Sequence, residues 1–336
     1  MTRRWVAIVA LSTGLLALAA GIGVAQRATV AQRIEIQVET IENFDARDAS
    51  RRQFGALQFR GGLVLKSSHS DFGGLSAVRI APDGRRFISV TDKGHWLRGL
   101  VTYRGDKPAG IADAEIAPIL GPDGRPLNRR GWYDTEALAE ADGALYVGIE
   151  RAHEIVRFEY RGVGLPGRGQ PIAAPPGLKT LPSNKGLECL AMPAKGQPYA
   201  GTLVAISERG LDTAGHIRGF LIGPAGGTFS VKRSDEFDIS DCAITPRGDL
   251  LLLERRFSWA RGVAMRIRRV PLAMLKPGAL LDGPELIFAD MGYQIDNMEG
   301  LAVHRADGML VLTLVSDDNF SPLQRTLLLQ FALAEP

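Results

Sequence analysis

The sequence predicts an all-β fold, and more narrowly a β-propeller of four-stranded antiparallel blades. One observation is internal repetition, because five segments of the chain share one pattern of two short apolar runs that are usually separated by a Gly-containing turn. The other observation is strand-length apolar alternation with turns such as Pro82-Asp83-Gly84 between the runs. Four-stranded sheets repeated radially around an axis form a propeller.

The repeated unit can be followed through the chain in its two halves. The first half is GGLSAV at Gly73, TEALA at Thr135, LECLA at Leu187, SDCAI at Ser240 and MEGLAV at Met298. The second half is RFISVTD, ALYVGIE, TLVAISE, LLLLE and MLVLTLVSD. A third alternation such as HWLRGLVTY and usually a fourth such as AEIAPIL or PELIFAD follow. Five blades are therefore visible, and a sixth is an alternative if residues 33–54 and the longer insertions contain a degenerate copy.

The last copy is incomplete, because TLLLQFALAEP supplies a third strand but no fourth. The segment ALQFRGGLVLKSS, from Ala56 to Ser68, precedes the first copy and has the alternation of a strand. We expect it to complete the last sheet, so that an N-terminal strand closes the ring. No linker separates two compositions, which predicts one propeller domain over residues 54–336 and a lead-in over residues 26–53.

The first 25 residues resemble an export signal. A basic start at Arg3 and Arg4 precedes a long apolar run and the small-residue exit Gly23-Val24-Ala25. The apolar run approaches the length that spans a bilayer, so an uncleaved membrane anchor is the alternative. We expect a periplasmic or otherwise exported protein, with the Sec and twin-arginine routes both open.

Composition narrows the classes of partner. With 45% hydrophobic and 23% charged residues, the 336-residue chain has an ordinary globular composition. Loss of Arg3 and Arg4 with the leader would lower the formal charge from +3 to +1, and no basic tract indicates nucleic-acid binding. We expect a monomer that acts on a small molecule and has no membrane span unless the leader is retained.

Acidic residues recur at two positions of the repeat. Residues lining a propeller axis at one repeat position form a ring, and facing carboxylates need a cation or basic side chains to neutralise them. Carboxylate oxygens suit Ca²⁺ first, whereas the alternative is that each acid accepts backbone hydrogen bonds and fixes a turn. The last copy has Asp318 where other copies have Lys or Arg, which favours it as the metal side. The first position holds Gly73, Glu136, Glu188, Asp241 and Glu299, the second holds Asp92, Glu150, Glu208, Glu254 and Asp317, and the predicted metal ligands are Glu136, Glu188, Asp241, Glu299, Asp317 and Asp318.

Basic residues follow the second acidic position in four copies. They either form a belt of salt bridges between blades, which we favour, or present cations to a phosphate beside the metal. On the second hypothesis the catalytic candidates are Arg151, Arg209 and Arg255. His153 belongs to a histidine position shared with His95 and His216, and it is either a general acid or metal ligand at the rim or a polar turn residue.

Two cysteines, Cys189 and Cys242, each follow the acid at the first position. Equivalent side chains in a ring point in the same rotational sense, whereas a disulfide needs Cβ atoms that converge. We therefore favour two buried thiols.

In combination, the motifs resemble the phytase-like family of bacterial exported proteins, which is described as having esterase-like activity of the phytase type. The resemblance covers about residues 54–333 and rests on FGALQFRGGLVLKSS, DFGGLSAV, VTDKGHW, DTEALA, GIER, NKGLECLA, LLLLERRFSW, and NMEGLAV with LVSDDNF. It implies a β-propeller, export to the periplasm and a metal-dependent phosphoesterase activity. It also implies that clustered carboxylates bind Ca²⁺, which holds phosphate and activates water.

Three functional hypotheses follow from the sequence. The first is a Ca²⁺-dependent phosphoesterase, and the second is a non-catalytic binding propeller whose channel holds a structural cation. The third is a Ca²⁺-dependent lactonase, which would require asparagines among the ligands, although only Asn184 and Asn297 lie near the acidic positions. No G-x-S-x-G motif is present, which argues against a serine hydrolase.

Overall fold

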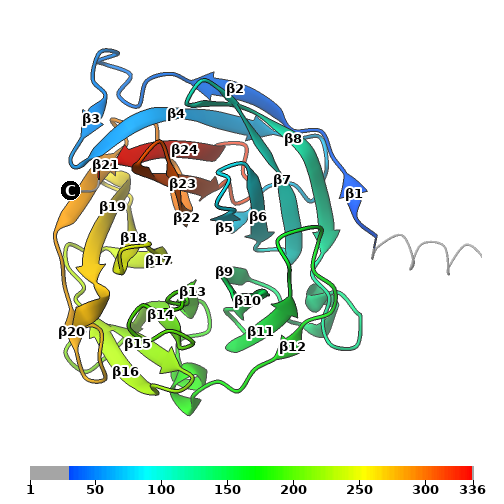
Figure 1. Ribbon diagram of the computed structural model, residues 1–336, viewed down its shortest axis with the longest axis vertical. Helices are drawn as coiled ribbons and strands as arrows, with labels where there is room; N and C mark the ends of the chain where they lie inside the picture. The colour runs from blue at the N-terminus through cyan, green and yellow to red at the C-terminus, as the bar shows by residue number, and fades with distance from the viewer. Residues whose placement is uncertain (1–29, 335–336) are drawn as a thin grey trace, which may run out of the picture.

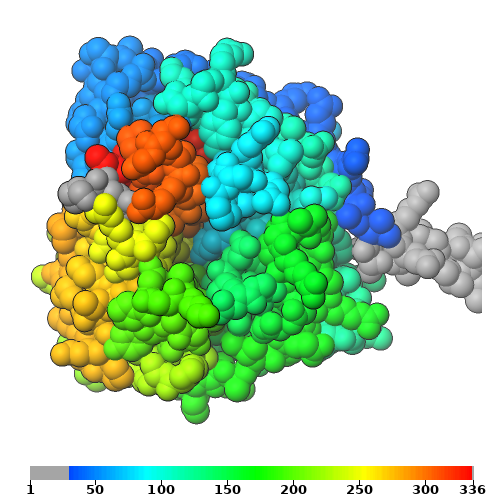
Figure 2. All heavy atoms as spheres, in the orientation of Figure 1, coloured from blue at the N-terminus to red at the C-terminus, as the bar shows by residue number. Residues whose placement is uncertain are grey.

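The computed structural model describes residues 30–334, in which 24 strands form five sheets arranged around a common axis (Figure 1). The predicted all-β propeller is confirmed, with five blades and three short 3-10 helices. The face in Figure 2 is hollowed near the centre, where segments of different blades meet. The export signal expected in residues 1–25 lies outside the described residues. Within residues 30–334 no helix is long and apolar enough to cross a membrane.

Each blade takes its four principal strands mainly in chain order, with the first strand nearest the axis. The first blade contains β5 (Leu75–Ile80), β6 (Arg86–Thr91), β7 (His95–Arg104) and β8 (Lys107–Pro118), with β1 (Gln32–Arg33) at its outer edge. The second contains β9 (Thr135–Ala141), β10 (Ala144–Ile149), β11 (Glu154–Glu159) and β12 (Gln170–Pro171). The third contains β13 (Leu187–Ala191), β14 (Leu203–Leu211), β15 (Ile217–Ile222) and β16 (Gly227–Val231), extended by β20 (Leu280–Leu281).

The fourth and fifth blades follow the same plan. The fourth contains β17 (Asp238–Ile244), β18 (Asp249–Ser258), β19 (Gly262–Pro271) and β21 (Glu285–Asp290). The fifth contains β22 (Asn297–Ala306), β23 (Met309–Asp317) and β24 (Thr326–Leu333), with β4 (Leu57–Lys66), β2 (Gln37–Ile41) and β3 (Gln53–Phe54) from the start of the described chain. The 3-10 helices are η1 (Leu127–Arg130), η2 (Pro176–Thr180) and η3 (Leu272–Met274).

The N-terminal strand takes the place expected of it. Strand β4 pairs antiparallel with β24, so it supplies the fourth strand of the last blade. The segment considered for a sixth blade is distributed differently, because β1 pairs with β8 and β2 pairs with β4. Residues 33–54 therefore extend two existing blades.

Buried apolar side chains hold neighbouring blades together. Five clusters of buried residues form, and each draws its members mainly from two adjacent blades. The cluster between the fifth and first blades, for example, contains Leu328 of β24 and Val78 of β5. Successive side chains of a strand point to opposite faces of the sheet. Because neighbouring blades cover both faces, apolar side chains occur on both.

Each innermost strand contains a β-bulge at the same place. The bulge defines the structural alignment of the repeats, which differs from the predicted alignment in two blades. The pairing with the second strand skips one residue in every blade, and a bulge re-aims the side chain at that point. Gly73 lies three residues before the equivalent position of its blade, and Asp241 lies one residue after it. The bulged residues are Ser76, Glu136, Glu188, Ser240 and Glu299.

Cys189 and Cys242 form a disulfide between the third and fourth blades, with Cα atoms 5.2 Å apart. The prediction of two thiols was wrong because it assumed that both cysteines hold the same repeat position. In the observed register Cys189 is equivalent to Asp241, and Cys242 lies one residue further along β17. Neighbouring residues on a strand face opposite sides, so this offset turns the two sulfur atoms toward each other.

Replacing both cysteines with alanine is expected to lower the free energy of unfolding by about 2–4 kcal/mol. The disulfide joins residues separated by 53 positions, and a cross-link of that span restricts the unfolded chain strongly. Urea unfolding of the double variant would measure the loss. Thiol titration of the denatured wild type should detect no free thiol, and an unchanged unfolding midpoint in the variant would contradict the prediction.

Candidate metal centre

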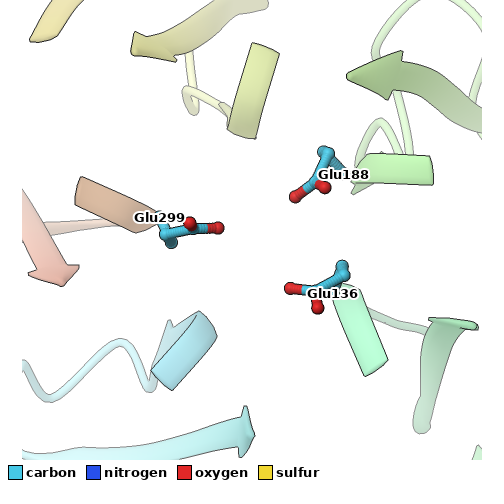
Figure 3. A group of neighbouring side chains, drawn as sticks. All are labelled: Glu136, Glu188 and Glu299. Atoms are coloured by element: carbon cyan, nitrogen blue, oxygen red, sulfur yellow. The ribbon is translucent and has the colours of Figure 1, made fainter. Parts of the chain in front are cut away.

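Three glutamates at the bulge positions point toward one another near the axis (Figure 3). Glu136, Glu188 and Glu299 come from β9, β13 and β22, the innermost strands of three blades. One carboxylate oxygen from each lies within 4.8 Å of the other two. Glu188 and Glu299 are buried, and Glu136 is half-buried. The structure thus brings together three of the predicted metal ligands.

At the second acidic position of the repeat, the structure also differs from the prediction in the fourth blade. The residue at this position is Arg255, which lies opposite Asp238 in the strand register, as Asp317 lies opposite Asn297 in the fifth blade. Glu254, the predicted acid, lies one place earlier and is fully buried, where Arg266 and Arg268 bind its carboxylate. The ring position therefore contains four acids and one guanidinium, namely Asp92, Glu150, Glu208, Arg255 and Asp317.

A second trio of glutamates overlaps the first. Glu150, Glu188 and Glu208 each place a carboxylate oxygen within 4.8 Å of the other two, so Glu188 belongs to both trios. Glu188 is only 3% exposed, and its Oε2 atom has no hydrogen-bond partner. A buried carboxylate oxygen without a partner is costly unless a cation neutralises it. We call these five residues, Glu136, Glu150, Glu188, Glu208 and Glu299, the acidic cluster.

Two basic side chains touch the edge of the acidic cluster. Arg255 Nη2 lies 3.3 Å from Glu299 Oε1 and 3.4 Å from Glu208 Oε1. Lys185 Nζ lies 2.7 Å from Glu208 Oε2. Among the described residues no ion pair reaches Glu136 or Glu188. Two positive charges therefore face five glutamates, which leaves the cluster with an excess of negative charge when its carboxylates are ionised.

Burial and mutual repulsion favour the protonated forms of these acids. Burial, followed by the charges of neighbouring glutamates, raises the pKa of Glu136 and of Glu188 well above the ordinary value. Burial raises the pKa of Glu150 to about 7, although the Gly186 N–H donates to its carboxylate. A bound divalent cation would reverse this preference by favouring the ionised carboxylates.

The donor set fits a calcium ion. Ca²⁺ binds oxygen ligands at about 2.4 Å, so two ligands of one ion lie no more than about 4.8 Å apart. Both trios meet this limit. Neither contains a histidine or cysteine, which the softer transition metals prefer. The orphaned Oε2 of Glu188 is the atom that such an ion would satisfy.

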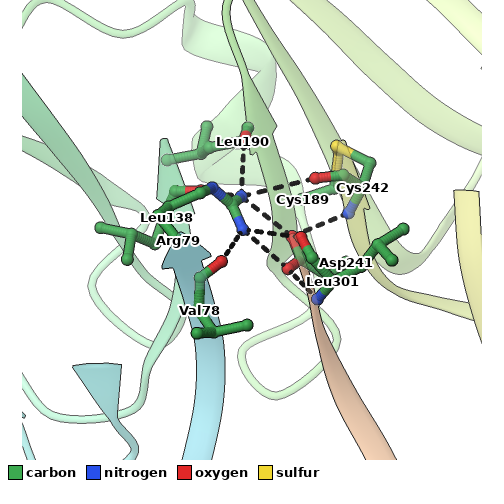
Figure 4. Close-up of a disulfide and its surroundings, with 8 residues drawn as sticks. All are labelled: Val78, Arg79, Leu138, Cys189, Leu190, Asp241, Cys242 and Leu301. Atoms are coloured by element: carbon green, nitrogen blue, oxygen red, sulfur yellow. Dashed lines mark hydrogen bonds and ion pairs between the residues drawn. A yellow bond between two sulfur atoms is a disulfide. The ribbon is translucent and has the colours of Figure 1, made fainter. Parts of the chain in front are cut away.

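Asp241, the fourth predicted axial acid, belongs to a separate arrangement (Figure 4). Its carboxylate is fully buried and lies 3.0 Å from Nη1 of Arg79. The backbone N–H groups of Leu301 and Cys242 also donate to it. Because these partners satisfy the carboxylate, the structure does not bring Asp241 into the acidic cluster.

Arg79 occupies the axis at the level of Asp241 (Figure 4). Its guanidinium donates hydrogen bonds to one backbone carbonyl from each of the five blades. The five carbonyls come from structurally equivalent residues, each two positions after the bulged residue, namely Val78, Leu138, Leu190, Cys242 and Leu301. A side-chain cation therefore fills a ring of carbonyls that converge on the axis, and it neutralises Asp241 there.

The predicted ligands Asp317 and Asp318 lie outside both trios. Asp317 is buried and accepts a hydrogen bond from the backbone of Asn319. Burial and the nearby Glu299 raise the pKa of Asp317 to about 8. Asp318 accepts hydrogen bonds from the Gly74 N–H and the Thr326 hydroxyl, which ties the fifth blade to the start of the first. Asp318 thus acts as a structural acceptor in this arrangement.

Of the four predicted catalytic residues, only Arg255 contacts the acidic cluster. Arg151 pairs with Asp134 of its own blade, and Arg209 pairs with Asp238 of the next blade. His153 is half-buried in a left-handed turn, and burial lowers its pKa. The favoured belt of salt bridges between blades is therefore confirmed for Arg209 and Arg255 but wrong for Arg151.

The sequence identified some residues of the site without assigning their roles. Glu150 and Glu208 stood at the second acidic position, yet they were not counted as ligands. Lys185 comes from the loop before β13, and Asn297 donates a 2.7 Å hydrogen bond to Glu299. Arg79 had no sequence signal, because it has no counterpart in the other copies.

Comparisons with known proteins give one family match. Residues 70–320 match the family model named Phytase-like, which is described as esterase-like activity of phytase. This span is more than half of the chain. No curated protein matches the sequence.

Similar solved structures show only general likeness. They include glutaminyl cyclase from Myxococcus xanthus, with 12% identity, coverage of 80% of this chain and 94% of that one, and a TM-score of 0.43. The WD40 repeats of RRP9 have 9% identity, coverage of 84% and 86%, and a TM-score of 0.38. The tail fibre of Staphylococcus aureus phage P68 has 10% identity, coverage of 84% and 52%, and a TM-score of 0.42. These low scores carry no information about function.

Proposed function

The chain belongs to the phytase-like family, and from this premise we propose that it is an exported, Ca²⁺-dependent phosphoesterase that hydrolyses a phosphorylated small molecule. The observation that carries the proposal is the acidic cluster, in which Glu188 is shared by two carboxylate trios and has a buried oxygen without a partner. The export signal predicted for residues 1–25 supports a location outside the cytoplasm.

The acidic cluster would hold the ion through Glu136, Glu188 and Glu299, with Glu150 and Glu208 beside them. When bound, Ca²⁺ supplies Lewis-acid chemistry, because it attracts phosphate oxygens and makes a coordinated water more acidic. A negatively charged phosphate would otherwise be repelled by these glutamates. The proposal therefore requires the cation for substrate binding as well as for reaction.

Arg255 is the side chain best placed to contact a phosphate at this site. Glu208 and Glu299 fix its Nη2 atom, and Asn297 Oδ1 accepts a 3.0 Å hydrogen bond from Nη1. Its Nε has no partner. A guanidinium held in this way can donate charge-assisted hydrogen bonds to phosphate oxygens and stabilise charge that develops on them. Arg151 and Arg209 form ion pairs with acids outside the acidic cluster, so they are less well placed to contact a phosphate there.

The substitution Glu188→Gln is expected to abolish both Ca²⁺ binding and phosphate release. It removes the ligand that the two trios share while keeping the size of the side chain. In the wild type, Ca²⁺ at 100 times its Kd should stabilise the folded state by about 2.7 kcal/mol. The variant should lose this gain, and in EDTA at pH 8 it should be at least as stable as the wild type, because one like charge is gone.

Thermal unfolding with Ca²⁺ or EDTA, together with phosphate release from aryl, sugar and inositol phosphates, would test these expectations. Glu140→Gln is the matched control, because Glu140 lies at the exposed far end of β9 from Glu136. Absence of a Ca²⁺-dependent shift in the wild type would refute the metal site. A shift without phosphate release from any ester would instead support a non-catalytic, metal-stabilised binding propeller.

A further inference from the structure

A cavity of about 450 Å³ lies between the fifth and first blades, away from the acidic cluster. Arg60 of β4, Tyr103 of β7, His304 of β22 and Gln330 of β24 contribute to its lining. The turns after β5, β7 and β22 complete it. Glu299 lies near the start of β22 and His304 near its end, so the cavity and the acidic cluster occupy opposite ends of this strand.

Three polar side chains of the cavity are more than nine-tenths buried and have an atom without a partner. These atoms are Nη1 of Arg60, Nδ1 of His304 and Oε1 of Gln330. The remaining donors of Arg60 are used, because Nε and Nη2 both donate to the backbone oxygen of Asp106. Gln330 Nε2 likewise donates to the Tyr103 hydroxyl. Buried polar groups without partners are rare and often mark the place of a ligand or water.

The charges around the cavity are mixed and nearly balanced. Arg60 and Arg85 face three carboxylates, those of Asp83, Asp106 and Asp307. His304 adds no charge at neutral pH, because burial, followed by the positive charge of Arg60, lowers its pKa to about 4. Because Arg86 pairs with Asp83 from outside the lining, two guanidinium groups and two carboxylates remain, and this balance favours neither an anionic nor a cationic ligand.

A ligand that both donates and accepts hydrogen bonds over its whole surface fits this lining. Hydroxyl groups donate to carboxylates and to the Gln330 oxygen, and they accept from Arg60 and Arg85. Tyr103 adds an aromatic ring beside them. The volume lies within the range of about 300–1,000 Å³ that is common for small-molecule sites.

We propose that this cavity binds a neutral sugar, either a free monosaccharide or the terminal residue of a glycan. The proposal does not depend on the metal centre, since no residue of the acidic cluster lines the cavity. It gives the protein a second ligand, on the side of the blades opposite to the proposed catalytic site.

Calorimetric titration of the wild-type protein in EDTA would test the site. The probes are glucose, galactose, mannose and N-acetylglucosamine, followed by their methyl glycosides as models of a glycan terminus, with inorganic phosphate and acetate as anionic comparisons. At least one sugar should bind with a Kd of about 1–10 mM, whereas neither anion should bind. Binding of the methyl glycoside as well as the free sugar would indicate a glycan terminus, and binding of the free sugar alone a monosaccharide.

The double variant Arg85→Gln/Asp307→Asn should weaken sugar binding about tenfold or more, because it removes two charged hydrogen-bonding groups from the exposed rim. Its matched control is Arg125→Gln/Asp142→Asn, in which the same side chains are changed in the similar turns Pro122-Asp123-Gly124-Arg125 and Ala141-Asp142-Gly143. The control should bind as the wild type does. No binding of any sugar at about 50 mM, binding of phosphate in its place, or equal effects of the two double variants would overturn the proposal.

Discussion

In EDTA the protein is expected to lose stability as the pH rises from about 7 to about 9, and Ca²⁺ is expected to restore the part of the loss that comes from the acidic cluster. Burial raises the pKa of Glu150 to about 7, and burial with the nearby Glu299 raises the pKa of Asp317 to about 8. Such carboxyls titrate at about pH 4 in an unfolded chain. Over this interval the folded protein must therefore release protons that the unfolded chain has already lost.

The direction of the effect follows from the number of protons bound in each state. Stability rises with pH where the unfolded state binds more protons, and here the folded state binds more. Each raised carboxyl therefore contributes stability that is fully present below about pH 4 and is lost as the pH passes its folded pKa. For Glu150, whose pKa rises from 4.5 to about 7, this loss corresponds to about 3 kcal/mol at high pH.

Urea unfolding at pH 7, 8 and 9, in EDTA and in Ca²⁺, would measure the two profiles. The other glutamates of the acidic cluster act in the same direction, since burial and neighbouring charges raise the pKa of Glu136 and of Glu188 well above the ordinary value. His304 does not contribute, since its pKa is lowered to about 4 and its imidazole is neutral in both states above about pH 7. Acids with a lowered pKa, such as Asp83, titrate at still lower pH. Parallel profiles with and without Ca²⁺ would show that the ion does not bind the carboxylates of the acidic cluster.

Much of the fold could be predicted because repetition makes several weak signals agree. A single apolar run such as ALQFRGGLVL does not reveal its neighbour, but five copies of one unit define which strand the last copy lacks. Strand β4 therefore could be assigned to the last sheet before its partner β24 was known. The outer strands β1, β2 and β3 could not be placed in this way, because residues 33–54 do not repeat.

The site was harder to predict because a bulge disturbs the register at the position where the acids lie. In SDCAI the acid Asp241 follows Ser240, and an alignment by residue type places Asp241 opposite the glutamates. Backbone pairing instead makes Ser240 the equivalent residue. This shift of one residue accounts for three errors: Asp241 as a ligand, Glu254 in place of Arg255, and the two cysteines as thiols. Hydrogen-bond register, which residue types do not encode directly, decides all three.

The substitution Arg79→Met is expected to lower the free energy of unfolding by about 3–5 kcal/mol. The methionine keeps much of the apolar stem but removes the cation from a fully buried carboxylate, Asp241, which lies 3.0 Å from Arg79 Nη1. It also leaves the carbonyl oxygens of Leu190 and Leu301 without the donors that Arg79 gives them at 3.1 and 3.0 Å. An uncompensated buried charge is more destabilising than a lost pair of neutral partners.

Comparison of Arg79→Met with Arg79→Met/Asp241→Asn in urea would separate the two contributions. The double variant should recover part of the lost stability, because a neutral amide replaces the unpaired carboxylate, whereas the carbonyls still lack their donor. Arg98→Met is the control, since Arg98 pairs with Glu115 in a partly exposed position and should cost only about 1 kcal/mol or less. If Arg79→Met were no more harmful than this control, the axial guanidinium would not hold the five blades together.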